Sequence, residues 1–351
     1  MTPEFQPQRP YLFGLGFLTL WLFGSSLLET FRIPEARYSW APSAEGSEAI
    51  VGPSQCAECH MAEFEVWKTS GHESGSKMLT RSKQAKEIAK ALGIRRIKND
   101  SRCTSCHFTM NSGSSKPKAL AGVSCESCHG AAENWLEAHQ NFGAKGALIA
   151  EETVAHRQQR YSDCDSAGMV RVGRVHAMAA QCLSCHVIND EELVDLAGHP
   201  DGMAFELLAW SQGEVRHNFV RGAGENASAS LGRKRMLFIA GQMQTMNFSL
   251  RALASAEGGG SFEEQNTQRV LSAIETLQAM AKLVYLPELE TVLEGSDQWD
   301  IAAGCSETAE LIAQRVAHCS VVLENRTDGS EFEAIDGMLP DAELYKGTAR
   351  K

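Results

Sequence analysis

Residues 56–60 read Cys56-Ala-Glu-Cys59-His60, and the same pattern, Cys-x-x-Cys-His, recurs at Cys103-Thr-Ser-Cys106-His107, Cys125-Glu-Ser-Cys128-His129 and Cys182-Leu-Ser-Cys185-His186. This pattern is typical of covalent attachment of a c-type haem: two thiols bond to the porphyrin edge, and the histidine ligates the iron. A bare Cys-x-x-Cys also suits zinc or a redox dithiol. Four copies, each completed by a histidine, favour four covalently bound haems over zinc knuckles.

The composition of the 351 residues fits an acidic protein with a modest aromatic core. Aromatic residues make up only 7% of the chain, so we expect haem to supply part of the apolar bulk. The net charge of −11 lies entirely in residues 252–351, where 18 acidic residues face 7 basic ones. No basic excess indicates a nucleic-acid partner. The three cysteines outside the motifs are an odd number, which does not indicate a disulfide framework; they are Cys164, Cys305 and Cys319.

The N-terminus predicts export across a membrane. Residues 11–28, YLFGLGFLTLWLFGSSLL, carry no charge, and as a helix they would span about 27 Å, close to a bilayer core. Residues 1–30 are therefore a signal anchor or a cleaved signal peptide, and the absence of an Ala-x-Ala site favours the anchor. We expect a bacterial inner-membrane protein that faces the periplasm, or a soluble periplasmic protein if the segment is cleaved. Residues 31–50 resemble an extended linker.

Two further regions follow, predicted to be a tetrahaem domain at 51–225 and an acidic helical domain at 226–351, here called the tail. Between the first two motifs, residues 77–98 hold eight Lys and Arg against one Glu and predict a basic helix that turns at Gly93. This face is either simply solvated, or holds haem propionates or an acidic partner. Residues 111–118 are predicted to form a loop. In the tail, apolar residues recur at helical spacing over 231–256, 262–286 and 306–325, and Leu311, Ile312, Val316, Cys319 and Val322 or Leu323 form one stripe. The fold class is mainly α, a haem-packed domain with long loops plus a C-terminal helical bundle.

Histidines outside the motifs are candidates for the sixth position on each iron, which decides whether that iron only transfers electrons or can bind a small molecule. Three of them follow a motif histidine by 10 to 13 residues: His72, His139 and His199. A helical run of that length spans about 15 Å, so each is predicted to cap a neighbouring haem rather than its own.

The second motif has no such follower, and His217 is the best candidate to close its iron, with His176 next. We expect His156 to be solvated and His318 to be structural.

The order of these features resembles the tetrahaem cytochrome c-554 family over roughly residues 51–220. The resemblance lies in the first motif with Trp67 and His72, the second motif, the segment Gly122–Gly130 with Trp135 and His139, and the distant fourth motif. Members of that family pass on electrons from hydroxylamine oxidoreductase. The resemblance implies a mostly helical domain with closely stacked haems, bis-histidine ligation at three haems, and one iron without a protein sixth ligand, here the second by default. The membrane segment and the tail depart from the family.

These features favour an electron carrier over an enzyme. The leading hypothesis is a tetrahaem cytochrome that passes single electrons between a redox-protein donor and acceptor, because no acid–base constellation is present. One alternative is a membrane cytochrome that oxidises the quinol pool, although the long linker separates the membrane segment from Cys56. Another is a reductase of a small nitrogen or sulfur oxide at an open iron, with an arginine binding the anion.

Overall fold

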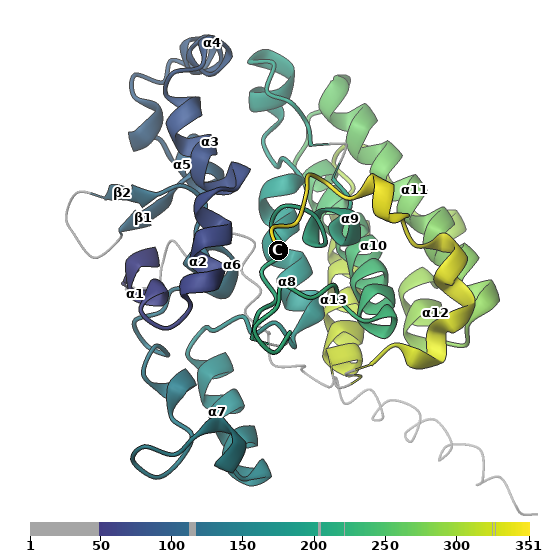
Figure 1. Ribbon diagram of the computed structural model, residues 1–351. Coiled ribbons are helices and arrows are strands. Elements are labelled where there is room, and N and C mark those ends of the chain that lie inside the picture. Colours follow the sequence, from purple (N-terminus) through teal and green to yellow (C-terminus); the bar gives the residue numbers. More distant parts are fainter. Residues whose placement is uncertain (1–48, 112–116, 203–204, 221, 325, 327) are drawn as a thin grey trace, which may run out of the picture. The chain divides into compact units, whose positions relative to one another are not determined.

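The computed structural model describes residues 49–111, 117–202, 205–220, 222–324, 326 and 328–351, all of which belong to one compact unit (Figure 1). As predicted, the fold is mainly α. The predicted membrane segment at residues 11–28 lies outside the described residues. Within the described ranges, no helix is both long and apolar enough to cross a membrane.

The motif region is built from short helices joined by long irregular segments. Its α-helices are α1 (Pro53–Ala57), α2 (Met61–Lys68), α3 (Gly71–Leu79), α4 (Lys83–Ala91), α5 (Ser101–His107), α6 (Cys125–His129), α7 (Val154–Ser166), α8 (Val175–His186) and α9 (Leu207–Ser211). Single helical turns lie between them: η1 (Ile97–Asn99), η2 (Ala138–Gln140), η3 (Ile149–Glu151) and the π-turn η4 (Glu192–Leu196).

One β-hairpin interrupts the helices, where the sequence predicts only a loop. Strands β1 (Thr109–Asn111) and β2 (Lys118–Ala121) pair antiparallel. Of the loop predicted at 111–118, residues 112–116 lie outside the described residues, and Asn111 and Lys118 belong to the strands. The strands are too short to show a period-2 pattern in the sequence. The Thr109 side chain fixes the hairpin's base, because its hydroxyl donates to the Gly122 carbonyl at 2.7 Å.

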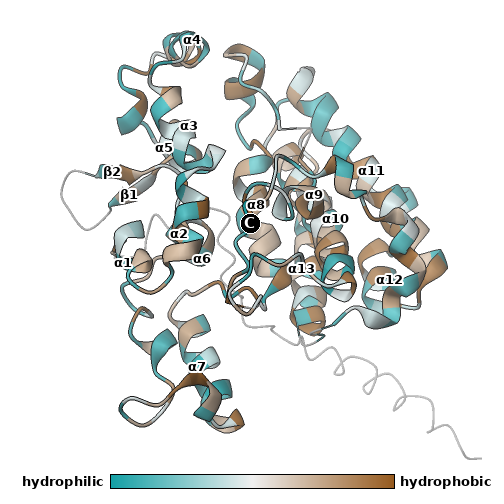
Figure 2. Ribbon diagram, in the orientation of Figure 1, coloured by the Kyte–Doolittle hydropathy of each residue, from teal (hydrophilic) through white to brown (hydrophobic). Residues whose placement is uncertain are grey.

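The tail forms the predicted helical bundle from α10 (Leu231–Ala254), α11 (Ser261–Leu283), α12 (Pro287–Leu293) and α13 (Ser306–Glu324). The helical turn η5 (Ser296–Gln298) lies between α12 and α13, and the turns η6 (Ser330–Met338) and η7 (Ala342–Leu344) follow α13. Polar and apolar residues alternate along α11 and α12 in Figure 2, as expected for helices that bury one face. Ser230 begins α10 by accepting a hydrogen bond from the Arg233 amide at 3.2 Å. Gly258 and Gly259, both with positive φ, form the turn to α11.

The stripe predicted along α13 is buried except at one edge. Ile312, Val316, Cys319 and Leu323 are buried, whereas Leu311 is 41% exposed and Val322 is 38% exposed. Leu311 and Val322 lie at the edge of the apolar face of α13, where the turn of the helix directs them away from the packed interior. Cys305 and Cys319 are buried, free thiols.

Helix α8 links the two regions. It carries the fourth motif, and it contacts α10 and α13 of the tail as well as α5 and α6 of the motif region. Val175 and Ala179 of α8 belong to the main apolar core, and Cys182 packs against its edge. The tail therefore lies directly against the helix that carries the fourth motif. The division into separate domains at residue 226 stays a prediction.

Candidate haem-binding site

Four short helices carry the motifs, and their contacts follow one order. Helix α1 contacts α6, α6 contacts α8, and α8 contacts α5. Helices α5, α6 and α8 each end at the motif histidine, while His60 follows α1 after a short turn. The motifs therefore lie side by side in the order first, third, fourth, second.

The motif thiols repeat this order. A hydrogen bond with Cys56 raises the pKa of the Cys125 thiol above its usual range, which links the first and third motifs. A hydrogen bond with Cys185 lowers the pKa of the Cys106 thiol to about 7, which links the fourth and second. Burial raises the pKa of Cys182, and the nearby Cys128 adds to that effect. All eight motif thiols are free.

Each motif histidine faces one histidine from elsewhere in the chain. The ring centres lie 6.4 Å apart for His60 and His139, 6.3 Å for His72 and His186, 6.1 Å for His107 and His199, and 6.3 Å for His129 and His217. Two metal–nitrogen bonds of about 2 Å each, with half a ring added on either side, also give about 6 Å between ring centres. The four separations therefore fit one metal ion between each pair of rings.

Backbone carbonyls orient several of these rings through Nδ1. Nδ1 of His129 lies 3.0 Å from the Val170 carbonyl, that of His199 lies 2.7 Å from Pro200, and that of His217 lies 2.6 Å from Val215. His139 makes the same contact with Leu136. A carbonyl can only accept, so Nδ1 must carry the proton and Nε2 keeps its lone pair. This is the tautomer that a metal-ligating histidine needs.

The structure places the predicted histidines as follows. His72, His139 and His199 each face a motif histidine, and none of them faces the one that it follows in sequence. His217 faces the third motif, not the second as expected, because the chain after α9 passes beside His129. His199 takes the position opposite the second motif. The second motif therefore also has a facing histidine, contrary to what the resemblance implies by default.

The remaining histidines face no motif. His176 is fully buried, and within the described residues neither ring nitrogen has a hydrogen-bond partner; burial lowers its pKa to about 4. His318 is exposed on α13. His156 is half-buried rather than solvated, and its Nδ1 lies 2.8 Å from the Glu152 carboxylate.

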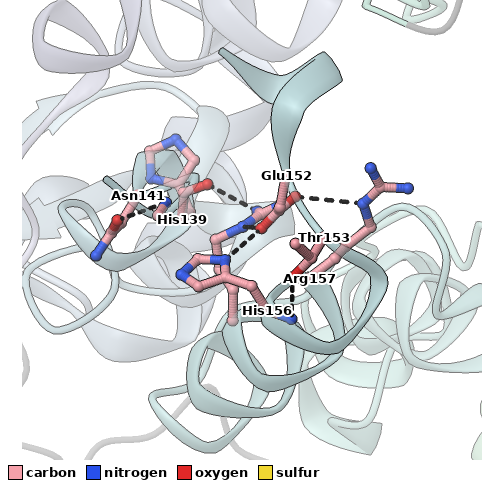
Figure 3. A network of polar contacts seen from close by, with 8 residues as sticks. His139, Asn141, Glu152, Thr153, His156 and Arg157 are labelled. Atoms are coloured by element: carbon pink, nitrogen blue, oxygen red, sulfur yellow. Dashed lines mark hydrogen bonds and ion pairs between the residues drawn. The ribbon is translucent and has the colours of Figure 1, made fainter. Parts of the chain in front are cut away.

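A polar network holds the backbone carbonyl of His139 (Figure 3). Arg160 donates to the His139 carbonyl at 2.9 Å and to both carboxylate oxygens of Glu152, at 2.7 and 2.6 Å. Arg157 and His156 also contact this carboxylate. The hydrogen bonds from Arg160, followed by those from His156 and Arg157, hold the pKa of Glu152 at about 2 despite the opposing effect of burial. The network thus fixes the backbone that carries His139 on η2.

Two glycines permit close backbone contacts beside paired histidines. At Gly122 a Cβ would lie 2.3 Å from the His72 carbonyl, so only glycine permits the hydrogen bond from the next amide, Val123, to that carbonyl. Gly130 has φ +85° directly after His129, and a Cβ there would lie 2.2 Å from the Gly168 carbonyl. The sequence does not indicate these backbone contacts or the carbonyls that orient the histidine rings, because both depend on main-chain atoms that every residue type has.

The residues present fit a haem better than zinc. Zinc knuckles need four ligands around one ion, and no group of three or more His, Cys, Asp or Glu in the described chain could hold a metal. A haem takes only two protein ligands on opposite sides, as in the four pairs. In addition, the buried Trp135 Nε1, next to His139, has no acceptor among the described residues. A propionate would supply one.

Comparison with known proteins shows which family the motif segment resembles. Residues 55–130, which hold the first three motifs, match the family model described as cytochrome c554 and c-prime. The chain is 35% identical over 132 residues to cytochrome c-554 of Nitrosomonas europaea, an overlap that covers 32% of this chain and 56% of the relative. The chain therefore spans about half the length of the curated relative that it matches. The comparison with solved structures found no match. Cytochromes of this kind carry covalently bound haem c, and we conclude that residues 55–130, with the first three motifs, are similar to the cytochrome c-554 family.

Proposed function

We propose that this protein is a tetrahaem c-type cytochrome that passes single electrons between redox proteins. The observation that carries the proposal is the set of four facing histidine pairs, each with a ring separation of 6.1–6.4 Å. Bound haem iron would supply the one-electron chemistry. The chain's own part would be to supply two histidine rings to every iron.

The ligand sets follow from the pairs. His60, His107, His129 and His186 would hold the irons as proximal ligands, and His139, His199, His217 and His72 would be their respective distal ligands. The thiols that attach the haems belong to Cys56, Cys59, Cys103, Cys106, Cys125, Cys128, Cys182 and Cys185. An iron with two histidines has no free position for a substrate, so the pairs favour a carrier over a reductase.

The order of the motif helices supports a relay. Helix α1 contacts α6, α6 contacts α8, and α8 contacts α5, so the third and fourth haems would lie in the interior of a row. The first and second haems would then be its two ends. Electrons would enter near one end motif and leave near the other, and no side chain would need to move a proton.

We propose a periplasmic location, because haem is attached to this motif after export. Residues 11–28 would supply the apolar segment for export, retained as an inner-membrane anchor or removed. No observation favours oxidation of the quinol pool. The mature N-terminus, determined by mass spectrometry on the purified protein, decides between anchor and cleaved signal.

The haem count tests the proposal directly. The intact mass should exceed that of the polypeptide by four haems, and the pyridine haemochrome absorbance should give four haems per chain. Replacing both Cys103 and Cys106 by Ser should remove one haem from the mass. A chain that carries fewer than four haems when all eight thiols are present would contradict the proposal.

A further inference from the structure

The basic stretch of the sequence forms a groove on the surface near the second motif. Its lining includes Ile94, Ile97 and Asn99, together with five cations: Lys86 and Lys90 of α4, and Arg95, Arg96 and Lys98 of the following segment. We call these five residues the basic groove. Its volume is about 810 Å³. All five side chains are exposed.

The basic groove is free of compensating carboxylates. Among the residues that the structure describes, none of its five cations has an ion-pair partner, whereas most other arginines in that part of the chain are ion-paired, Arg102 and Arg171 among them. The nearest acidic side chains are already engaged. Glu87 of α4 pairs with Lys83, and the Asp100 carboxylate caps α5. The net charge of −11 lies in residues 252–351, so the basic groove is a cationic cluster within a region of balanced charge.

The basic groove also adjoins the second motif. The helical turn η1, which contributes to the groove, contacts α5. Asp100 caps the start of α5 by accepting a hydrogen bond from the Arg102 amide at 3.1 Å. The Lys98 ammonium lies 6.0 Å from the centre of the Phe108 ring, and Phe108 directly follows His107. In Figure 1, α4 lies beyond α3 and α5, on the side opposite α7. The groove thus lies at the end of the motif row that the second motif forms.

We infer that the basic groove is the docking site of an acidic redox protein, which exchanges electrons with the chain at the second motif. The inference rests on the proposed electron-carrier function. Clustered, unpaired cations attract an oppositely charged patch and raise the association rate by about 10- to 1,000-fold at low ionic strength. A docking surface at one end of the row shortens the path between the partner and the relay.

The experiment uses the full-length, four-haem protein and an acidic plant-type ferredoxin as the probe. Reduction of the oxidised cytochrome by reduced ferredoxin is followed by stopped flow from low to high ionic strength. Lys86→Glu/Arg95→Glu/Arg96→Glu reverses three groove charges. Lys145→Glu/Lys282→Glu/Lys351→Glu makes the same change in net charge at exposed positions elsewhere.

We expect the groove variant to lose about tenfold or more of the second-order rate at low salt, and the control variant to lose less than about twofold. The wild-type rate should fall with salt, and the groove variant's should not. Equal losses in the two variants would overturn the inference. A groove variant that keeps its rate but shifts a haem potential would also overturn it, because the cations would then bind propionates. The same holds for a groove variant that keeps its rate but no longer self-associates in analytical ultracentrifugation, because the groove would then contact a second copy of the chain.

A neutral flavin semiquinone separates this inference from the function on which it rests. It carries no charge, so it should reduce wild type and both variants at the same rate. If it reduces all three while ferredoxin does not distinguish them, the docking site is wrong and the carrier stands. If it fails to reduce the wild type, both proposals fail.

Discussion

The ring of His199 lies 6.1 Å from the ring of His107, with an angle of 54° between their planes. His199 follows the fourth motif in sequence, yet it faces the second. This relationship gives the second motif the same two-histidine arrangement as the other three. It is the relationship on which the choice between a carrier and a reductase depends.

Removal of His199 should open one iron. We expect His199→Ala to convert one haem from low spin to high spin, and to bind one carbon monoxide per chain after reduction, because the iron loses its only distal ligand. Optical and EPR spectra measure this change. His318→Ala is the matched control, since His318 is exposed and faces no motif. Unchanged spectra in His199→Ala would remove His199 from the ligand set.

Removal of His217 should open a different iron. The double variant His199→Ala/His217→Ala should therefore bind two carbon monoxide molecules, whereas each single variant binds one. This outcome follows because His217 faces His129 and not His107. If the double variant binds only one, both histidines serve the same iron, which would contradict the pairing of His217 with the third motif.

The Glu152 carboxylate should make the protein sensitive to acid. Its pKa falls from 4.5 to about 2 in the folded chain, so its contribution to stability is present above pH 4.5 and is lost as the pH falls toward 2. We expect Glu152→Gln to lower the melting temperature by a few degrees at pH 7, because Arg160 is left without its anion. The melting temperatures of variant and wild type should converge near pH 2. A difference independent of pH would mean that the charge is not responsible.

The tail core should depend on Leu277, which is fully buried on α11. Leu277→Ala should lower the free energy of unfolding by about 2–5 kcal/mol, the usual cost of a cavity left by a buried leucine. Leu271→Ala on the same helix is the control, because Leu271 is 41% exposed, and it should cost less than about 1 kcal/mol. Urea titrations followed by circular dichroism measure both. Equal costs would indicate that α11 does not pack as described.

The sequence predicts the parts of this molecule better than their pairing. Regular periodicity was enough to predict α10, α11 and α13, and the motif pattern identifies the eight thiols and four histidines, because both signals are local. Which distal histidine faces which motif is a long-range property. His72 and His186 are 114 positions apart. Gly122 lies against the His72 carbonyl and Gly202 against the His186 carbonyl, and neither backbone approach has a side-chain signature. The misplacement of His217 has the same cause.

EPR spectroscopy of the fully oxidised wild-type protein tests the central claim most directly. Four facing histidine pairs predict four low-spin ferric haems per chain and no high-spin signal. Quantified high-spin signal equal to one haem per chain would contradict the account, since one pair would then fail to close its iron.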